Sequence, residues 1–209
     1  MTILIATRNA HKVDEIRHIL GPDHRYLTLR DFPNAPEVVE DADTFQDNAR
    51  KKAIELAGWL STQQGIDTHE TFVLADDSGL EVDALKGAPG VHSARFAADD
   101  KTKGNSPDAA NNAKLLRLLQ NVPAEKRTAR FRCVIAFVAV LHPGEAKIFD
   151  GACEGRIEFT PRGRHGFGYD PLFVPHGYTQ SVAELGETDK NKLSHRAKAL
   201  EKLQRVLAT

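Results

Sequence analysis

The amino-acid sequence predicts an α/β protein, and three observations carry this prediction. Residues 3–6 form a short apolar run that leads through a polar turn into a helical pattern, which is how an α/β unit begins. Residues 71–75 form a second short apolar run, typical of a buried strand. Residues 129–141 alternate arginine with apolar residues and then become apolar on both faces, as a strand entering a core does.

The first half of the chain predicts two helices separated by a loop. The first helix follows the polar turn at residues 7–11 and ends at Gly21-Pro22. Residues 31–43 are acidic and contain prolines, so a loop is expected there. A long helix is predicted from about Thr44 to Ser61. Its buried stripe comprises five apolar side chains: Phe45, Ala49, Ala53, Leu56 and Leu60.

The second half predicts more strands and a final helix. The strand at 71–75 is expected to end in a polar turn at residues 76–79. An exposed loop at 97–108 precedes a helix that Asp108 is expected to cap. Two separate strands are expected near 146–149 and 155–159. The last helix begins near Ser194 and is expected to turn four apolar side chains inward: Ala197, Leu200, Leu203 and Val206.

Composition and charge narrow the class of protein. The 209 residues suit one large domain or two joined lobes, and 41% hydrophobic with 27% charged residues is a globular profile. Lys plus Arg number 28 against 29 Asp plus Glu, so the charge offers no broad footprint for a nucleic-acid partner. Two isolated cysteines make no disulfide framework or zinc pattern. A signal peptide and a membrane-spanning run are both missing, so we expect a cytoplasmic protein without a membrane partner.

The turn at residues 7–12 is a candidate anion site. The first N–H groups of a helix have no partner within the helix, and the helix dipole favours an anion there. Thr7 and Asn9 add hydrogen-bond donors, and Arg8 and Lys12 add positive charge. The glycines of a P-loop are missing, so this segment alone is better interpreted as an ordinary capped helix start.

Asp76 and Asp77 form a candidate metal site after the second predicted strand, where ligands bind in open α/β sheets. Adjacent carboxylates repel one another, and burying them without a cation is costly. A Mg²⁺ ion held by a few carboxylates, waters and substrate phosphates would resolve both problems. Glu40 could complete the site, although other acidic residues of its loop compete, and Asn48 and Lys52 could face it from the next helix. A solvated turn is the alternative.

The segment at residues 166–171, GFGYDP, is a candidate base site. Its glycines allow close backbone approach, and Phe167 and Tyr169 offer aromatic faces on which a base could stack. Asp170 could accept hydrogen bonds from a base or a sugar. A tight turn with core aromatics is the alternative interpretation.

The start of the last helix is a second candidate nucleotide contact. Ser194 resembles an N-cap, which places His195 and Arg196 in the first helical turn. Cations at that position are disfavoured by the helix dipole, so binding of an anion or of a keto-bearing base would explain their presence. A surface helix start is the alternative interpretation.

Together these segments resemble the inosine/xanthosine triphosphate pyrophosphatase family, also called the HAM1 family of noncanonical purine nucleotide pyrophosphatases. The order of ADDSGLEVDAL, GFGYDP and LSHR is highly specific. The matching segments run nearly from end to end: ATRNAHK, TFQDNARKKA, ADDSGLEVDALKGAPGVHSARF, NNAKLL, RTARFRC, GFGYDPLF, AELG and KNKLSHRAKAL.

The resemblance implies the fold and the site. It implies an elongated α/β fold with two lobes and a curved central mixed sheet flanked by helices, a single domain over residues 1–209, a substrate cleft between the lobes, and a homodimer. Asp77 would be the general base and a ligand of the Mg²⁺ cofactor, with Glu40 as a second metal ligand. The implied substrate contacts are Thr7, Arg8, Asn9, Ala10, His11, Lys12, Ser78, Phe167, Gly168, Tyr169, Asp170, Lys190, His195 and Arg196.

The implied reaction is hydrolysis of ITP, dITP and XTP to a nucleoside monophosphate and pyrophosphate. A donor aimed at the purine 6-keto oxygen accepts hypoxanthine and xanthine and rejects adenine, whose amino group is itself a donor. Guanine also has the keto group, so its rejection needs contacts at position 2. The rival functions are a pyrophosphatase for modified pyrimidine nucleotides and a nucleotide sensor without turnover. The balanced charge disfavours a nucleic-acid-binding role.

Overall fold

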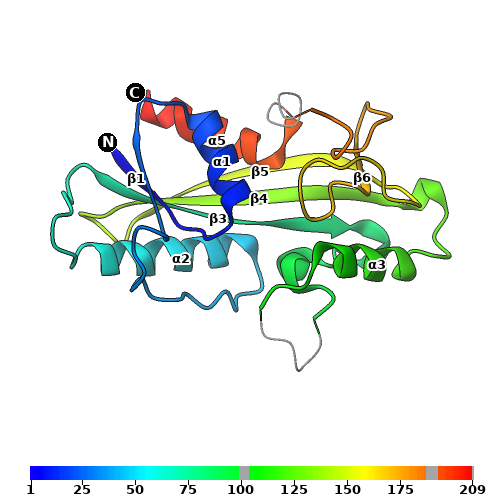
Figure 1. Ribbon diagram of the computed structural model, residues 1–209, viewed down its shortest axis with the longest axis horizontal. Coiled ribbons are helices and arrows are strands. Elements are labelled where there is room, and N and C mark those ends of the chain that lie inside the picture. Colours follow the sequence, from blue (N-terminus) through cyan, green and yellow to red (C-terminus); the bar gives the residue numbers. More distant parts are fainter. Residues whose placement is uncertain (99–103, 187–192, 209) are drawn as a thin grey trace. The chain divides into compact units, whose positions relative to one another are not determined.

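The computed structural model describes residues 1–98, 104–186 and 193–208, and the chain divides into two compact units. Unit 1 comprises Met1–Asp77, Cys133–Gly151 and Arg196–Thr209, and unit 2 comprises Ser78–Arg132 and Ala152–His195. Six strands form one sheet in the order β2-β1-β3-β4-β5-β6 (Figure 1). The predicted substrate cleft between lobes stays a prediction.

The sheet is mixed. Strand β1 (Thr2–Ile5) pairs in parallel with β2 (Arg25–Thr28) and with β3 (Thr71–Val82). Strand β5 (Ala146–Ile157) pairs antiparallel with β6 (Phe173–Pro175), and β4 (Thr128–Ala139) lies between β3 and β5. A mixed sheet with flanking helices confirms the predicted α/β class.

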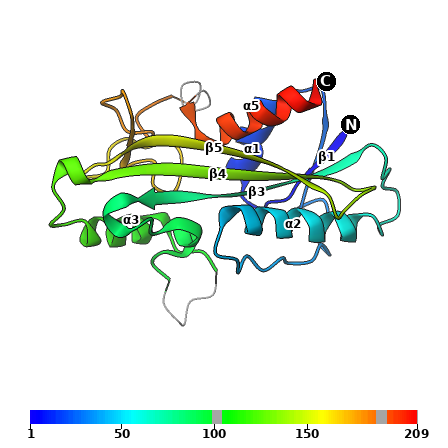
Figure 2. The same cartoon turned by 180° about the vertical axis from the view of Figure 1, so that it is seen from behind.

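Helices cover both faces of the unit 1 strands. Helices α1 (Ala10–Leu20) and α5 (His195–Leu207) lie on one face, and α2 (Phe45–Leu60) lies on the other (Figures 1 and 2). Gly21 ends α1 at a φ of +83°, which favours glycine. The core under α1 and α5 contains Ile3, Ile5, Val13, Ile16, Leu20, Leu74, Cys133, Ile135, Phe137, Phe149, Ala199, Leu200 and Leu203. The predicted stripe of α2 is buried throughout.

Unit 2 has its own core and a helix, α3 (Asp108–Leu118). Its short 3₁₀ helices span Asp83–Leu85 (η1), Gly90–Arg95 (η2) and Ala124–Lys126 (η3). The core comprises Leu80, Val82, Leu115, Leu119, Ala129, Phe131, Cys153, Ile157, Tyr169, Leu172, Phe173 and Val182. The predicted capping role of Asp108 is wrong, because its Oδ2 instead accepts a hydrogen bond of 2.7 Å from the Gly168 N–H.

Three further expectations are corrected. A turn is predicted at residues 76–79 because these residues have weak strand propensity, but strand β3 continues through them. Their partners in the folded protein override the local preference. The two strands predicted between 146 and 159 are the single strand β5. Val206 is exposed, unlike the rest of its predicted stripe. The short strands β2 and β6 were not predicted, since three or four residues carry too little periodicity.

No helix in the described part of the chain combines the length and apolar character that crossing a membrane requires.

Candidate active site

The alternation of side chains along β3 sends its two aspartates to opposite faces of the sheet. Leu74 belongs to the core under α1 and α5. Successive strand residues point to opposite faces, so Asp76 shares the face of Leu74 and Asp77 points toward the α2 face. Both side chains are buried, at 2% and 7% residue exposure. The neighbouring carboxylates therefore have separate environments.

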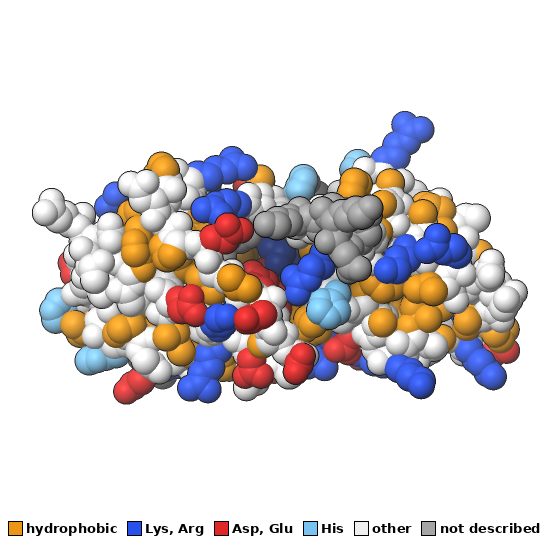
Figure 3. Space-filling model, turned by 90° about the horizontal axis from the view of Figure 1, so that it is seen from below, with side chains coloured by type: hydrophobic (Ala, Val, Ile, Leu, Met, Phe, Trp, Pro, Cys, Tyr) orange, Lys and Arg blue, Asp and Glu red, His pale blue; other side chains and the backbone are white. Residues whose placement is uncertain are grey.

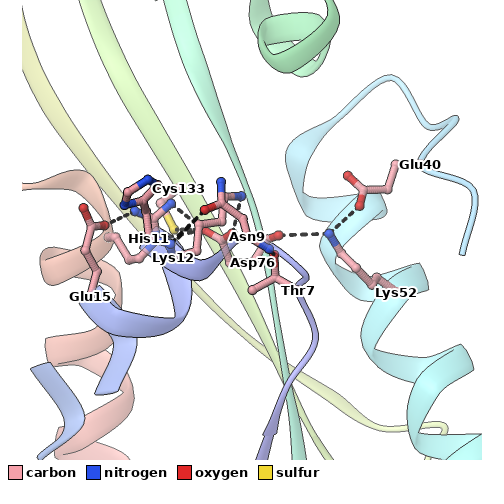
Figure 4. Close-up of polar contacts among 10 residues, drawn as sticks. Thr7, Asn9, His11, Lys12, Glu15, Glu40, Lys52, Asp76 and Cys133 are labelled. Atoms are coloured by element: carbon pink, nitrogen blue, oxygen red, sulfur yellow. Dashed lines mark hydrogen bonds and ion pairs between the residues drawn. The ribbon is translucent and has the colours of Figure 1, made fainter. Parts of the chain in front are cut away.

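Asp76 is the centre of a buried charge network (Figure 4). Its Oδ1 pairs with the Lys12 ammonium of α1. Its Oδ2 accepts hydrogen bonds from Arg196 Nε at 3.1 Å and from the Cys133 thiol at 3.4 Å, and it forms an ion pair with Arg196 Nη2 at 3.0 Å. Arg196 also pairs through Nη1 with Glu15 of α1. The acidic residue thus lies beside cations from two helix starts, as the sequence predicted.

These partners keep Asp76 ionised. Burial alone opposes ionisation, but the positive charges of Arg196 and Lys12 outweigh it and hold the pKa of Asp76 well below its usual value. Burial also opposes the charge on Arg196, and the carboxylates of Asp76 and Glu15 outweigh it and raise the pKa of Arg196. Asp76 and Arg196 therefore both stay charged near neutral pH.

The α2 face surrounds Asp77 with different groups. Lys52 of α2 pairs with Glu40 and donates a hydrogen bond of 3.1 Å to the Asp76 carbonyl (Figure 4). Asn48, one turn earlier, is buried and bonds both the N–H and the carbonyl of Ala42, which ties the acidic loop to α2. Asn48 and Lys52 therefore face the candidate site together, as expected, but from the Asp77 side of the sheet.

The pKa of Asp77 is shifted in the opposite direction from that of Asp76. Burial raises the pKa of Asp77 to about 6, with the Glu40 carboxylate adding to the rise and Lys12, Lys52 and an Asn48 hydrogen bond opposing it. A base is most effective when its pKa lies close to the working pH. Two adjacent carboxylates whose environments separate their pKa values are a signature of divided catalytic roles.

The turn before α1 is partly satisfied by its own residues. The Asn9 side chain caps α1 by accepting hydrogen bonds from the N–H groups of His11 at 3.0 Å and Lys12 at 3.4 Å. The expectation that the N–H groups of this helix start are free is therefore wrong for these two. Arg8, Asn9, Ala10 and His11 are exposed, and Thr7 and Lys12 are half-buried.

Some of the predicted base contacts in the glycine turn at residues 166–171 are buried, and others are partly exposed. Tyr169 is buried in the core, and its hydroxyl donates to the Ser93 carbonyl at 2.8 Å, so its ring offers no stacking face. Asp170 is also buried, and its Oδ2 accepts from the Phe167 N–H at 3.0 Å. Phe167 and Gly168 are partly exposed and line a pocket beside α3.

A second pocket in unit 2 is lined by residues from two of the predicted motifs, GFGYDP and the start of the last helix. Asp170, Ser194 and His195 line it together with apolar side chains. The His195 ring stacks on Phe131, with the ring centroids 5.0 Å apart and the planes at 14°. Ser78, which follows Asp77 in β3, is half-buried. Lys190 lies outside the described residues.

We expect Gly166→Ala to destabilise the protein by about 2 kcal/mol or more, through left-handed backbone strain and a steric clash. Gly166 has a φ of +77°, and a Cβ there would lie 2.1 Å from Asp170 Oδ2. Gly168→Ala is the matched control, because Gly168 has a φ of +62° and nothing lies within 4 Å of the added Cβ. Urea unfolding measures both, and equal losses would refute the clash.

Glu15 and Cys133 were not predicted as part of the site. Glu15 lies three residues after Lys12 on α1, a spacing that places both on one helix face and could have indicated a shared partner. Cys133 was interpreted only as a small core residue, and no sequence pattern links it to Asp76, 57 residues away.

The fold and site define a class of protein. It is an α/β protein with two adjacent buried aspartates, whose pKa values are shifted in opposite directions, next to helix starts that carry positive charge. The Ham1 family model matches residues 3–206, and the chain belongs to this family.

Individual relatives extend this match over the whole chain. A dITP/XTP pyrophosphatase from Desulforamulus reducens is 48% identical over 209 residues, covering 99% of this chain and 96% of the relative. The structure of a HAM1 protein from Coxiella burnetii aligns with a TM-score of 0.82 at 36% identity, covering 100% and 98% of the two chains. A nucleoside-triphosphatase/dITP/XTP pyrophosphatase structure from Mycobacterium abscessus gives a TM-score of 0.73 at 39% identity, covering 97% and 98%.

Proposed function

We propose that this protein hydrolyses noncanonical purine nucleoside triphosphates, ITP, dITP and XTP, to the monophosphate and pyrophosphate, and so removes them from the nucleotide pool. The observation that carries the proposal is Asp77, a buried carboxylate whose pKa of about 6 suits a general base. The similarity to the dITP/XTP pyrophosphatase of Desulforamulus reducens supports the same reaction.

Asp77 would act on the attacking water. It accepts a proton as the water oxygen bonds to the α-phosphorus, and the bond from that phosphorus to the β-phosphate bridging oxygen breaks in line. Pyrophosphate leaves with the broken bond's electron pair. Lys12, held by Asp76 yet partly exposed, would offset the charge that develops on the leaving group.

Glu40 and Asp77 would hold a Mg²⁺ ion. Mg²⁺ takes one or two carboxylates and fills its other positions with waters and phosphates. Glu40 lies near enough to Asp77 to raise its pKa, and a divalent cation would relieve this repulsion. Within the described ranges no three His, Cys, Asp or Glu side chains are grouped to hold a metal. When bound, the ion would neutralise phosphate charge.

The remaining residues would recognise the substrate. We assign the triphosphate to the turn at Thr7–Lys12 and the nucleoside to Ser78, Phe167, Gly168, Asp170, Lys190 and His195. Phe167 offers the exposed aromatic face, because the Tyr169 ring is buried. Acidic and basic side chains are interspersed on the face in Figure 3, which agrees with a small-molecule substrate better than with a nucleic acid.

The deciding experiment is pyrophosphate release from a nucleotide panel. ITP, dITP, XTP, ATP, GTP and a modified pyrimidine triphosphate are each assayed with Mg²⁺ and with a chelator. We expect pyrophosphate from the first three, with kcat/KM at least about 100-fold above ATP because opposed donors disfavour adenine, and loss of turnover with the chelator. Binding without turnover would support a sensor, and preference for the pyrimidine would support the other pyrophosphatase class.

We also propose that the protein is a cytoplasmic homodimer, as the family resemblance implies. Light scattering on the purified chain measures its mass directly, and a monomer at the assay concentration would refute the dimer.

A further inference from the structure

We propose that Asp108 and Asn112 of α3 are positioning residues, which hold the backbone of Gly168 and so keep the neighbouring Phe167 ring in place for a purine base. This inference rests on the proposed function, in which Phe167 offers its aromatic face to the nucleoside. Asp108 Oδ2 accepts a hydrogen bond of 2.7 Å from the Gly168 N–H, and Asn112 Nδ2 donates one of 3.0 Å to the Gly168 carbonyl. We call these two hydrogen bonds the Gly168 clamp.

The Gly168 clamp fixes two consecutive peptide groups of the glycine turn. The Gly168 N–H belongs to the peptide group shared with Phe167, and the Gly168 carbonyl belongs to the one shared with Tyr169. Gly168 has a φ of +62°, and a glycine backbone adopts several regions of φ and ψ at similar free energy. The two hydrogen bonds hold it in one of these regions, so α3 sets the direction in which the chain reaches Phe167.

The residues that follow Gly168 are anchored separately. Tyr169 is buried in the unit 2 core, and its hydroxyl donates to the Ser93 carbonyl at 2.8 Å. Asp170 is also buried, whereas Phe167 is partly exposed. The chain connects Phe167 to these buried residues through Gly168. A rotation about the Gly168 backbone would therefore move the Phe167 ring relative to the rest of the turn.

Helix α3 supports the Gly168 clamp from a fixed position in unit 2. Asp108 and Asn112 are four residues apart, so their side chains lie on one face of the helix. Leu115 belongs to the unit 2 core, and the Asn111 side chain accepts a hydrogen bond of 2.7 Å from the Ala97 N–H. These contacts hold the helix in place without involving the glycine turn.

The surroundings of Asn112 indicate what asparagine contributes at this position. Asn112 is 8% exposed, and its Oδ1 has no hydrogen-bond partner within the described ranges. A buried acceptor without a partner costs free energy, and an apolar side chain of similar size would avoid that cost. The hydrogen bond from Nδ2 to Gly168 is therefore the specific contribution of Asn112.

The experiment pairs Asn112→Ala with Asn111→Ala as its matched control. Both asparagines are buried on α3, but the Asn111 side chain bonds the backbone of Ala94, Ala97 and Ser106 instead of Gly168. For each variant, calorimetry gives the Kd for inosine monophosphate and for inorganic pyrophosphate with Mg²⁺. Pyrophosphate release gives kcat and KM for ITP, and thermal unfolding identifies a temperature at which every variant is folded.

We expect Asn112→Ala to weaken the binding of inosine monophosphate about tenfold, within the range for a lost base–aromatic stack, and to leave the Kd for pyrophosphate within about twofold. KM for ITP should rise more than kcat falls, because the base contact is the same in the ground and transition states. Asn111→Ala should change neither Kd by more than about twofold, because it leaves the Gly168 clamp intact. In a Phe167→Ala background, Asn112→Ala should weaken the binding of inosine monophosphate no further.

Asp108 provides a second test that does not disturb the interior, because its side chain is exposed. Asp108→Ala removes the acceptor for the Gly168 N–H and should weaken the binding of inosine monophosphate in the same way. Asp108→Asn keeps an acceptor oxygen and should restore this binding to within about twofold of the parent. If Asn112→Ala does not fold, these two variants decide the question.

Two outcomes would overturn the inference. Equal weakening of inosine monophosphate and pyrophosphate binding would show that the clamp residues act on the whole site and not on Phe167. Unchanged Kd values in the folded Asn112→Ala and Asp108→Ala variants would show that the two hydrogen bonds serve stability alone. A parent protein that releases no pyrophosphate from ITP, dITP or XTP would refute the proposed function instead, and the affinities for inosine monophosphate would still test the clamp.

Discussion

Asp77→Asn will lower turnover of ITP by at least about 100-fold, the scale expected when a general base is lost. Asparagine nearly matches aspartate in size but cannot accept the proton of the attacking water. Pyrophosphate release at saturating substrate and Mg²⁺ measures the loss. Near-parental turnover would remove Asp77 from the proposed mechanism.

The same variant will be more stable than the parent when no divalent cation is present. Burial raises the folded-state pKa of Asp77 to about 6, so the ionised carboxylate costs more free energy in the folded than in the unfolded protein. This cost is absent below about pH 4, grows as the pH rises, and is complete above about pH 6. We expect the variant to gain up to about 3 kcal/mol in free energy of unfolding near pH 8.

Urea unfolding with a chelator at two pH values separates this effect from a general one. The stability difference should be present near pH 8 and small near pH 4. A variant that is less stable than the parent at the higher pH would show that the Asp77 carboxylate is stabilised by its surroundings. That outcome would contradict its role as a general base with a raised pKa, because such a base destabilises the folded protein when it is ionised.

The helices were predictable because each carries a repeating stripe and a local stop or cap. Thr44 caps α2 by accepting from the Asp47 N–H at 3.1 Å, and Gly21 ends α1. Neither feature depends on residues far along the chain. The course of β3 does depend on them, since residues 76–79 favour a turn locally and remain in a strand only with distant partners.

The candidate site was predictable as a set of residues but not as an arrangement. Motifs identified Lys12, Asp76, Asp77 and Arg196, and the structure joins three of them in one network. The division of labour between the aspartates was not visible, because it follows from which face of β3 each occupies. A chain segment interpreted as a turn has no faces, so the error about β3 hid the separation of the two carboxylates.

Asp76→Asn will destabilise the protein by about 3–5 kcal/mol, the cost of removing one partner from a buried ion pair. Arg196 and Lys12 would keep their charges inside the protein with less to balance them. The folded-state pKa of Asp76 is depressed, so its stabilising effect is complete above the unfolded value of about 4 and is lost as the pH falls. The stability difference should therefore be constant between about pH 5 and pH 8 and shrink in more acidic solution.

The control for Asp76→Asn is Asp150→Asn, which breaks an exposed pair of 2.6 Å with Lys202 in the same unit. Its side chains are 58% and 50% exposed, so solvent screens the interaction and its loss should cost less than about 1 kcal/mol. Urea unfolding of both variants gives the comparison. Similar small losses would show that the Asp76 network contributes little to stability. The positive charges of Lys12 and Arg196 would then cost little free energy in the folded protein without the Asp76 carboxylate. Both variants remove the same negative charge from unit 1, so the large contrast that we expect follows from the burial of Asp76 and from its pairing with two cations.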